Sequence, residues 1–265
     1  MLNILKYQRC GKTSKFLKVA IKAAKGAGNL LLNLHEKRWV RYKKDLSILT
    51  QADLISERFI KKELKKAFPN YNVLSEEAGF EEKKSAYTWI IDPIDGTRNY
   101  FRNLPTWCVS VGLIYKNEMV VAAIYDPVRK ELFYAEKNKG AYLNNMRLGV
   151  SDEKEISKII ISVLRTRTKS AIKRTANAFK LLTKGVTLRI HGSTCLELCY
   201  LAAGRLDALI GIHLAPWDSG TGLLVAKEAG AKIIYLDKDK DVFSPKTFVV
   251  ANSYELAKEI KKTFL

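Results

Sequence analysis

The spacing of the apolar residues changes along this chain, and that change limits the folds it can adopt. Over residues 14–34 and 50–67, apolar side chains recur every three or four positions, which predicts two amphipathic helices. Short apolar runs separated by turn residues follow, and they are typical of a largely antiparallel sheet. Beyond about residue 150, strand-like and helical runs alternate. The pattern predicts an α+β half over residues 1–150 and an α/β half over 151–265.

Individual elements can be placed within these halves. In the first half, Thr13 or Ser14 is expected to cap the first helix, and strands are expected at 73–74, 87–91, 108–115, 119–125 and 131–135. In the second half, strands are expected at 159–163, 186–190, 206–212, 232–235 and 248–251. The helices expected there cover 170–183, the segment from its cap Ser193 to Gly204, 219–229, and the residues after Ser253. Pro93 is expected to end its strand, because proline cannot donate to a ladder.

Composition favours a folded protein of the cytoplasm. Hydrophobic residues make up 47% of the 265, which is enough for a large core. The sequence has no apolar run of about 18 residues, so no membrane span is expected, and the N-terminus does not resemble a secretion signal. Four scattered cysteines, Cys10, Cys108, Cys195 and Cys199, do not suggest a disulfide framework. They are expected to be buried apolar thiols in a reducing compartment.

The net charge of +19 leaves three interpretations open. It could attract nucleic acid, steer a phosphorylated substrate, or reflect the lysine-rich surface of a heat-adapted protein. Glutamine occurs only twice, which favours heat adaptation. The lysines are spread along the chain and mixed with glutamates, without an arginine-rich arm or zinc-finger spacing, so dedicated nucleic-acid binding is not predicted.

The segment Asp92-Pro93-Ile94-Asp95-Gly96 is the strongest sign of chemistry. An apolar strand runs into the two aspartates, and Gly96 permits a tight bend that can aim both carboxylates into one cavity. Together with the Ile94 carbonyl they are hard oxygen ligands, of the kind that Mg²⁺ or Mn²⁺ prefers. Without a cation such crowding would be costly. Asp-Pro and Asp-Gly also make ordinary turns, so this segment alone does not decide the matter.

Two further acidic segments add to this one. Glu76 and Glu77 follow a short apolar strand, and Asp218 lies at the start of an expected helix. Separately, each has an ordinary explanation, as exposed turn residues or as a helix N-cap. Three acidic clusters in one chain favour a metal site.

These segments resemble the inositol monophosphatase family, which belongs to the lithium-sensitive, magnesium-dependent phosphatases. The resemblance rests on Ser75-Glu76-Glu77, Trp89 through Thr97, Lys139 through Asn144, Trp217-Asp218, Glu228 through Ala231, and a degenerate stretch from Asp45 to Asp53. Their order and spacing match over nearly the whole chain. The resemblance implies a five-layered α-β-α-β-α sandwich, often dimeric, so a homodimer is expected.

The resemblance also implies a set of site residues. Glu76, Asp92 and the Ile94 carbonyl match the ligands of a first metal, and Asp92, Asp95 and Asp218 match those of a second. Glu76 also borders a weaker third site in the family. Two or three Mg²⁺ ions, which Mn²⁺ could replace, would neutralise phosphoryl charge and activate a water.

Other positions match residues with catalytic or substrate-binding roles in the family. Thr97 and Asp53 match the pair that activates the attacking water, beside the catalytic Glu76. The backbone at Gly96 and Thr97 resembles a phosphate cradle. Ser193, Thr194 and Asp218 fall near the substrate's sugar side. Lys43, Lys44 and Arg98 are either phosphate contacts or solvated surface.

The sequence departs from the family's inositol-specific members before Trp217. Those members have a glutamate on the preceding strand, whereas this chain reads Leu209-Ile210-Gly211-Ile212-His213. The expected substrate is therefore inositol 1-phosphate, fructose 1,6-bisphosphate, or both, and a 3′-phosphoadenosine phosphatase is an alternative. A haloacid-dehalogenase mechanism would need one residue between the aspartates, and two intervene here. The second alternative class is a phosphatase fold that has drifted to nucleic-acid binding.

Overall fold

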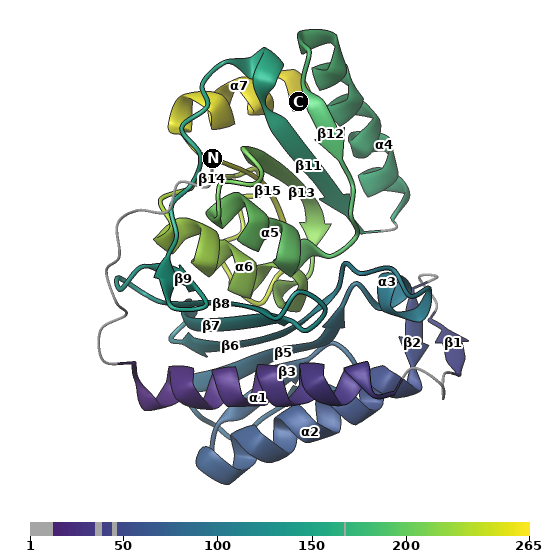
Figure 1. Ribbon diagram of the computed structural model, residues 1–265, viewed down its shortest axis with the longest axis vertical. Helices are drawn as coiled ribbons and strands as arrows, with labels where there is room; N and C mark the ends of the chain where they lie inside the picture. Colours follow the sequence, from purple (N-terminus) through teal and green to yellow (C-terminus); the bar gives the residue numbers. More distant parts are fainter. Residues whose placement is uncertain (1–12, 35–38, 44–46, 167) are drawn as a thin grey trace.

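The chain folds into five stacked layers (Figure 1). The computed structural model describes residues 13–34, 39–43, 47–166 and 168–265. Two helices cover an eight-stranded sheet, two more helices separate this sheet from a five-stranded one, and further helices cover the far side. Cys10, His35, Lys44 and Asp45 lie outside the described residues. The expected α-β-α-β-α sandwich is confirmed.

The first layer consists of α1 (Lys15–Leu32) and α2 (Gln51–Ala67), and local capping fixes where each helix begins. The Ser14 hydroxyl accepts the Leu17 N–H at 3.1 Å, so Ser14 and not Thr13 is the cap. Thr50 accepts the Asp53 N–H at 3.4 Å, while the Asp53 carboxylate accepts the Thr50 N–H at 2.7 Å. This reciprocal capping box fixes the Asp53 side chain at the start of α2.

The first sheet has the strand order β10-β9-β8-β7-β6-β5-β3-β4. Its strands are β3 (Asn72–Ser75), β4 (Gly79–Glu81), β5 (Tyr87–Asp95), β6 (Cys108–Tyr115), β7 (Glu118–Asp126), β8 (Glu131–Glu136), β9 (Ala141–Leu143) and β10 (Met146–Arg147). Only β3 and β5 pair in parallel among the described strands of this sheet. A separate ribbon joins β1 (Val40–Tyr42) to β2 (Ile48–Thr50). The short helix α3 (Thr97–Phe101) follows β5.

The expectation that Pro93 ends its strand is wrong. β5 continues to Asp95, and the ladder with β6 is interrupted between Asp92 and Asp95 before it resumes at Cys108. Pro93 is tolerated because it falls in this irregular step, where no ladder donor is needed. Its carbonyl accepts the Ser56 hydroxyl of α2 at 2.9 Å. The irregular step lets β5 place both aspartates at its end.

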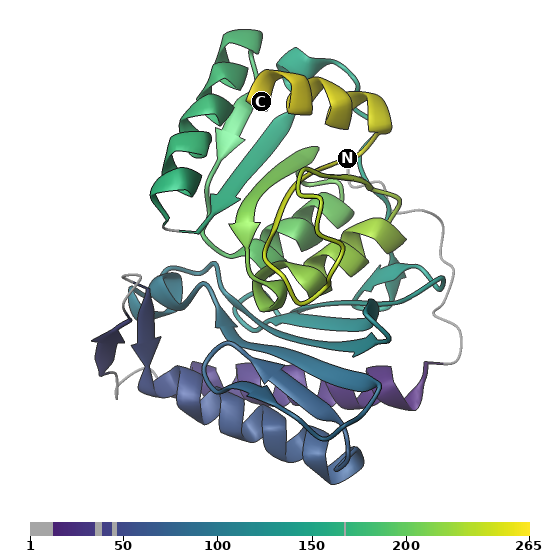
Figure 2. The same cartoon turned by 180° about the vertical axis from the view of Figure 1, so that it is seen from behind.

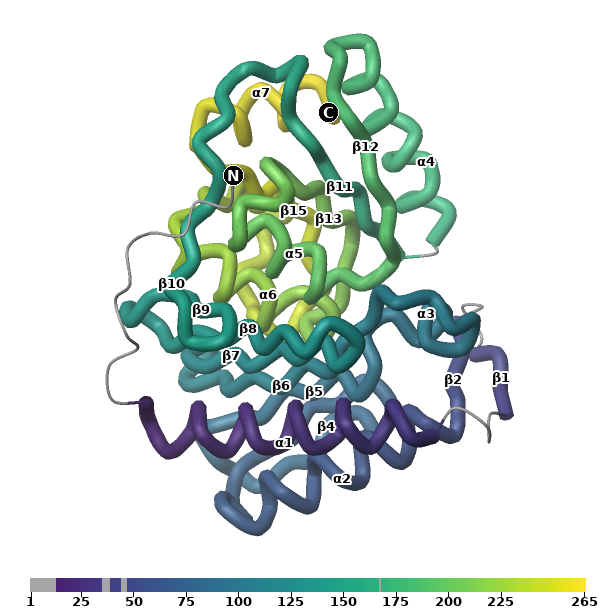
Figure 3. Tube along the Cα trace, in the orientation of Figure 1, coloured from purple at the N-terminus to yellow at the C-terminus, as the bar shows by residue number. Residues whose placement is uncertain are grey.

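The second sheet has the order β12-β11-β13-β15-β14. Its strands are β11 (Ile160–Arg165), β12 (Thr187–Arg189), β13 (Ala208–Leu214), β14 (Lys232–Tyr235) and β15 (Lys246–Ala251). Helices α5 (Thr194–Ala202) and α6 (Pro216–Glu228) lie between the sheets, and α4 (Lys169–Ala178), the 3₁₀ turn η2 (Phe179–Lys184) and α7 (Tyr254–Phe264) cover the other face (Figure 1). The chain crosses from the first sheet to the second between β10 and β11, through the 3₁₀ turn η1 (Ile156–Lys158) (Figure 3).

Three apolar cores hold the layers together. Leu17, Leu31 and Trp89 belong to the core between the first helices and the first sheet. The middle core surrounds α5 and α6, and the third lies between the second sheet and the outer helices. Cys108, Cys195 and Cys199 are buried, as expected for apolar thiols. No helix in the described part of the chain is long and apolar enough to cross a membrane.

Candidate metal centre

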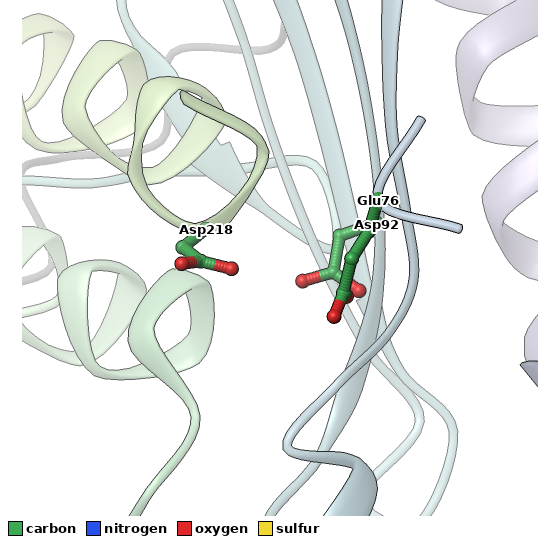
Figure 4. Close-up of side chains that lie close together, drawn as sticks. All are labelled: Glu76, Asp92 and Asp218. Carbon is green, nitrogen blue, oxygen red and sulfur yellow. The ribbon is translucent and has the colours of Figure 1, made fainter. Parts of the chain in front are cut away.

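Three carboxylates from distant parts of the chain meet between the two halves. Ligand oxygens of Glu76, Asp92 and Asp218 all lie within 4.8 Å of one another. Figure 4 shows the carboxylates of Glu76 and Asp92 on one side of a shared space and that of Asp218 on the other. Asp92 is buried, and the other two are half-buried. Sequence reasoning predicted all three as metal ligands, and the structure brings them together.

Strand pairing and helix geometry explain this convergence. Strands β3 and β5 run parallel, and the Glu76 N–H donates to the Ile91 carbonyl at 3.3 Å. The carboxyl ends of parallel neighbours meet at one sheet edge, so Glu76 and Asp92 emerge side by side. Asp218 lies in the first turn of α6, where its carboxylate accepts the Ala215 N–H at 3.2 Å. The first turn of a helix favours a negative side chain.

The electrostatics of this cluster favour a bound cation. Burial, followed by the charge of Glu76, raises the pKa of both Asp92 and Asp218 well above the usual range. Ionising these carboxylates is therefore costly, first because they are buried and then because they repel one another. A set of carboxylate oxygens is the donor set that Mg²⁺ takes in proteins. The residues present therefore fit a divalent magnesium site.

Lys43 already supplies one positive charge to this region. Its ammonium donates to Glu76 at 2.9 Å and to Glu77 at 2.8 Å. Burial alone would lower the pKa of Lys43, but the two glutamates outweigh it and raise that pKa. Burial also raises the pKa of Glu77 to about 7. Lys43 is therefore a counter-ion of the acidic cluster, a role that neither sequence interpretation included.

Asp95 has a different set of partners from Asp92. Its Oδ2 accepts the Ser193 hydroxyl and the Cys195 N–H, each at 2.7 Å, and its Oδ1 accepts the Thr194 N–H at 3.1 Å. Burial raises the pKa of Asp95 to about 6, while these hydrogen bonds oppose the shift. Asp95 does not belong to the group of three carboxylates described above.

The expectation that Ser193 caps α5 needs correction. Ser193 occupies the N-cap position, but its side chain makes no capping hydrogen bond. The hydroxyl instead donates to Asp95, and the Asp95 carboxylate accepts the first free N–H groups of α5. A carboxylate from the other half of the chain thus replaces the local cap. The contact also places Ser193 and Thr194 next to the acidic end of β5.

The structure brings Thr97 and Asp53 together. The Thr97 hydroxyl lies 3.4 Å from Asp53 Oδ1 and 3.0 Å from the Ile94 carbonyl oxygen. The second Asp53 oxygen accepts the Thr50 hydroxyl at 2.6 Å. Burial raises the pKa of Asp53 to about 7, although the hydrogen bonds from Thr50 lower it. The pair has the arrangement of a hydroxyl held by a carboxylate, beside a candidate metal ligand.

Gly96 allows the backbone to pass close to the second half. Its φ is +90°, a left-handed conformation, and an added Cβ would lie 3.0 Å from the Thr106 carbonyl and 3.2 Å from Ser193 Cβ. Any side chain at this position would therefore collide with the segment that carries Ser193. The expected tight bend is present.

Two residues that support the site were not predicted from the sequence. Asn99 donates to the carbonyls of Thr106 at 2.6 Å and His191 at 2.7 Å, and so links α3 to the loop before α5. Glu197 is fully buried and accepts the N–H groups of His191 at 3.1 Å and Gly192 at 3.0 Å. A carboxylate inside the otherwise apolar run 195–202 was the available signal for Glu197.

Comparison with known proteins identifies the family of this chain. Residues 12–264 match the model of the inositol monophosphatase family. The chain belongs to this family. It is 36% identical over 223 residues to the Nus factor SuhB of Xylella fastidiosa, a match that covers 81% of this chain and 80% of that protein.

Other family members carry enzyme names. The chain is 34% identical over 221 residues to the fructose-1,6-bisphosphatase/inositol-1-monophosphatase of Aquifex aeolicus, covering 82% of this chain and 84% of the relative. The solved IMPase of Thermotoga maritima superposes with a TM-score of 0.85 at 31% identity, covering 95% of this chain and 97% of the other. Membership of the inositol monophosphatase family thus accounts for the fold.

Proposed function

We propose that this protein hydrolyses a small phosphate monoester with Mg²⁺ held by Glu76, Asp92 and Asp218. The observation that carries the proposal is the convergence of these carboxylates from both halves within 4.8 Å. Family membership supports phosphatase chemistry. When bound, Mg²⁺ would neutralise charge on the phosphoryl oxygens and activate a water.

Asp95 and the Ile94 carbonyl complete the proposed ligand set. Asp95 Oδ1 accepts one hydrogen bond among the described residues, whereas Oδ2 accepts two from nitrogen and oxygen donors. A carboxylate oxygen has two lone pairs, so Oδ1 keeps capacity for a metal. The Ile94 carbonyl accepts the Thr97 hydroxyl and also has a second lone pair. We assign both residues as ligands on this capacity and on their match to the family's pattern.

Thr97 and Asp53 have the geometry to position a water. The Thr97 hydroxyl lies between Asp53 and the Ile94 carbonyl, and this fixes the oxygen's location. Asp53, with its pKa raised to about 7 by burial, can accept a proton relayed by Thr97 near neutral pH. The backbone at Gly96 and Thr97 would place the phosphate, while Ser193 and Thr194 would contact the rest of the substrate.

The proposed substrates are inositol 1-phosphate and fructose 1,6-bisphosphate. Strand β13 ends at Leu214 without the glutamate of inositol-specific members, and it is irregular between Gly211 and Leu214. His213 there has a φ of +54°, an unusual conformation for a residue other than glycine. A relative named for both activities supports a permissive site.

Phosphate release from the two substrates, measured side by side with Mg²⁺ and with a chelator, tests the proposal. Magnesium-dependent release is expected from at least one of them, and the ratio of the rates identifies the preferred substrate. Phosphate release from a 3′-phosphoadenosine substrate is measured in the same way, to test the alternative activity. If the folded, magnesium-loaded protein releases phosphate from none of the three, the proposed substrate class is wrong.

An aspartyl-phosphate mechanism can be distinguished directly. Asp92 Oδ1 accepts the Ile94 N–H at 3.0 Å, and two residues separate Asp92 from Asp95. This spacing favours Asp92 and Asp95 as metal ligands over Asp92 as a nucleophile that a second aspartate assists as an acid. Beryllium fluoride should therefore form no adduct on Asp92, and such an adduct would contradict the mechanism.

Nucleic-acid binding is the second candidate function. The net charge of +19 favours it, and the name Nus factor, borne by a relative, does not describe a phosphatase. Submicromolar, sequence-indifferent binding that weakens steeply with salt, together with no hydrolysis, would establish this function in place of the first.

We further propose a homodimer in the cytoplasm, with the lysine-rich surface as a heat adaptation. The resemblance to the family suggests the dimer, and composition suggests the rest. Light scattering should give twice the mass of one chain.

A further inference from the structure

A second hollow lies beside the middle layer, away from the acidic cluster. It has a volume of about 550 Å³ and lies between the turn joining β6 to β7, helix α6, and the segment 236–245 that follows β14. In Figure 2 this segment forms the loop in front of the middle helices. Glu76, Asp92 and Asp218 do not line it. This hollow is called the α6 groove below.

One face of α6 forms the floor of the groove. Its lining residues lie three or four positions apart along the whole helix, namely Pro216, Ser219, Gly220, Leu223, Leu224 and Lys227. The opposite face packs on α5, where an added Cβ at Gly222 would lie 2.7 Å from Leu198. Met119 and Ile233 extend the apolar floor, and Val242 adds an apolar side chain from the facing loop. The floor of the groove is therefore apolar, although its leucines are largely buried, with 7% of Leu223 and 5% of Leu224 exposed.

The rim of the groove is basic. Five lysines and three acidic residues line it, namely Lys137, Lys227, Lys238, Lys240, Lys246, Glu118, Asp237 and Asp239. Lys137 pairs with Glu118 at 2.5 Å, and Lys246 lies 3.7 Å from Asp239. The Asp237 carboxylate accepts the Thr247 N–H. Within the described residues, Lys227, Lys238 and Lys240 have no ion-pair partner.

The outer wall of the groove is tied to the first half of the chain. The Val242 N–H donates to Asn117 Oδ1 at 2.9 Å, and the rings of Phe80 and Phe243 lie 6.5 Å apart. Within the loop, the Asp241 N–H donates to Asp239 at 2.9 Å. These contacts hold the wall in position, so the groove is largely formed without a ligand.

We propose that the α6 groove binds a small anion with an apolar or aromatic body. Its volume falls within the roughly 300–1,000 Å³ typical of small-molecule sites. An apolar floor favours a flat hydrophobic body, and three unpaired lysines favour a negative group. The hydroxyls of a sugar or cyclitol phosphate would find few partners on this mostly apolar floor, so we expect a ligand of a different class from the proposed substrates.

The groove shares the first turn of α6 with the acidic cluster. Ser219 and Gly220 line the groove, while the adjacent Asp218 joins Glu76 and Asp92. An added Cβ at Gly220 would lie 2.8 Å from Met119 Cε, so this turn packs closely against the groove floor. A bound molecule would therefore contact the turn that positions Asp218.

Dye binding tests the groove without relying on catalysis. The anionic probe is 8-anilinonaphthalene-1-sulfonate, and its uncharged analogue is N-phenyl-1-naphthylamine. One saturable site is expected for each. The double variant Lys238→Glu/Lys240→Glu should weaken binding of the anionic dye by about tenfold or more and that of the neutral dye by less than about twofold. The control Lys261→Glu/Lys262→Glu, on α7, should leave the affinity for both dyes unchanged.

A second variant tests where the dyes bind. Val242 lies on the loop wall, so the larger side chain in Val242→Trp should fill the groove. Both dyes should then fail to bind, while the melting temperature stays close to that of the wild type. Saturating Mg²⁺ with inorganic phosphate should displace neither dye. Non-saturable binding, equal loss of anionic-dye affinity in both double variants, unchanged binding to Val242→Trp, or displacement by Mg²⁺ and phosphate would overturn the proposal.

Discussion

The carboxylate of Asp95, at the end of β5, accepts the backbone N–H of Cys195 in the first turn of α5 at 2.7 Å. The two residues are 100 positions apart and belong to different halves of the chain. Together with the bonds from Ser193 and Thr194, this contact ties the end of the first sheet to the start of a middle helix. One of the two aspartates on β5 therefore has a clear structural role, whereas the other faces the acidic cluster.

This difference predicts opposite effects on stability. In the metal-free protein at neutral pH, Asp95→Asn should lower the free energy of unfolding by about 1–3 kcal/mol, because an amide cannot accept all these hydrogen bonds. Asp92→Asn should raise it, because the buried Asp92 carboxyl must either take up a proton or repel its neighbours on folding, and an amide does neither. Denaturant unfolding of both variants measures the effect. Equal stability of Asp95→Asn and the wild type would show that the tie to α5 contributes nothing. Turnover should fall by orders of magnitude in both variants.

The stabilisation by Mg²⁺ should increase with pH. Burial raises the pKa of Asp53 to about 7 and that of Asp95 to about 6, from an ordinary 3.8. The folded metal-free protein thus holds more protons than the unfolded chain between about pH 4 and 7, and the free energy of unfolding falls as the pH rises through this range. Because Mg²⁺ binds the ionised carboxylates, the melting-temperature increase it causes should roughly double from about pH 5 to about pH 8. A pH-independent increase, measured by differential scanning fluorimetry, would contradict these shifts.

Lys43 should compete with the metal. Its ammonium bridges Glu76 and Glu77, so Mg²⁺ has to displace it from Glu76 or share that carboxylate. Lys43→Gln should strengthen Mg²⁺ binding by about tenfold, equivalent to about 1.4 kcal/mol. The control is Lys61→Gln, which removes the Lys61–Glu57 pair at 3.5 Å on α2 and should leave the affinity unchanged. Weaker Mg²⁺ binding by Lys43→Gln in isothermal titration calorimetry would mean that the ammonium supports the site.

The Thr97 hydroxyl should matter for turnover and little for folding. Thr97→Ala should lower kcat by about 10²–10⁴-fold, because the positioned hydroxyl between Asp53 and the Ile94 carbonyl is lost. Thr97→Ser keeps that hydroxyl and should retain most of the activity. The free energy of unfolding should change by about 1 kcal/mol or less in either variant. Steady-state kinetics on both variants would refute the role if serine and alanine reduce kcat equally.

Much of the fold could be predicted because its signals are local. The caps Ser14 and Thr50 act on N–H groups three residues away, and the apolar spacing marks the buried face of each helix. The short strands β1, β2, β4, β9 and β10 were not predicted, because two or three residues seldom show a period, whereas the equally short β12 was predicted from the residues 186–190 around it.

The site was predictable in composition but not in its tertiary connections. The acidic residues stand in recognisable segments, whereas the tie from Asp95 to α5 joins residues about 100 positions apart. The same contact explains why Ser193 does not cap its own helix. Pro93 was misjudged because a proline is tolerated in an irregular step of a ladder, and one sequence does not reveal that step.

The most direct test of this account is isothermal titration of the metal-free protein with Mg²⁺. The wild type should show saturable binding, Asp218→Asn should weaken that binding by about tenfold or more, and the exposed control Asp152→Asn should match the wild type. This result would establish that carboxylates from both halves hold the metal. Absence of saturable binding, or equal affinity in Asp218→Asn and the wild type, would contradict the account.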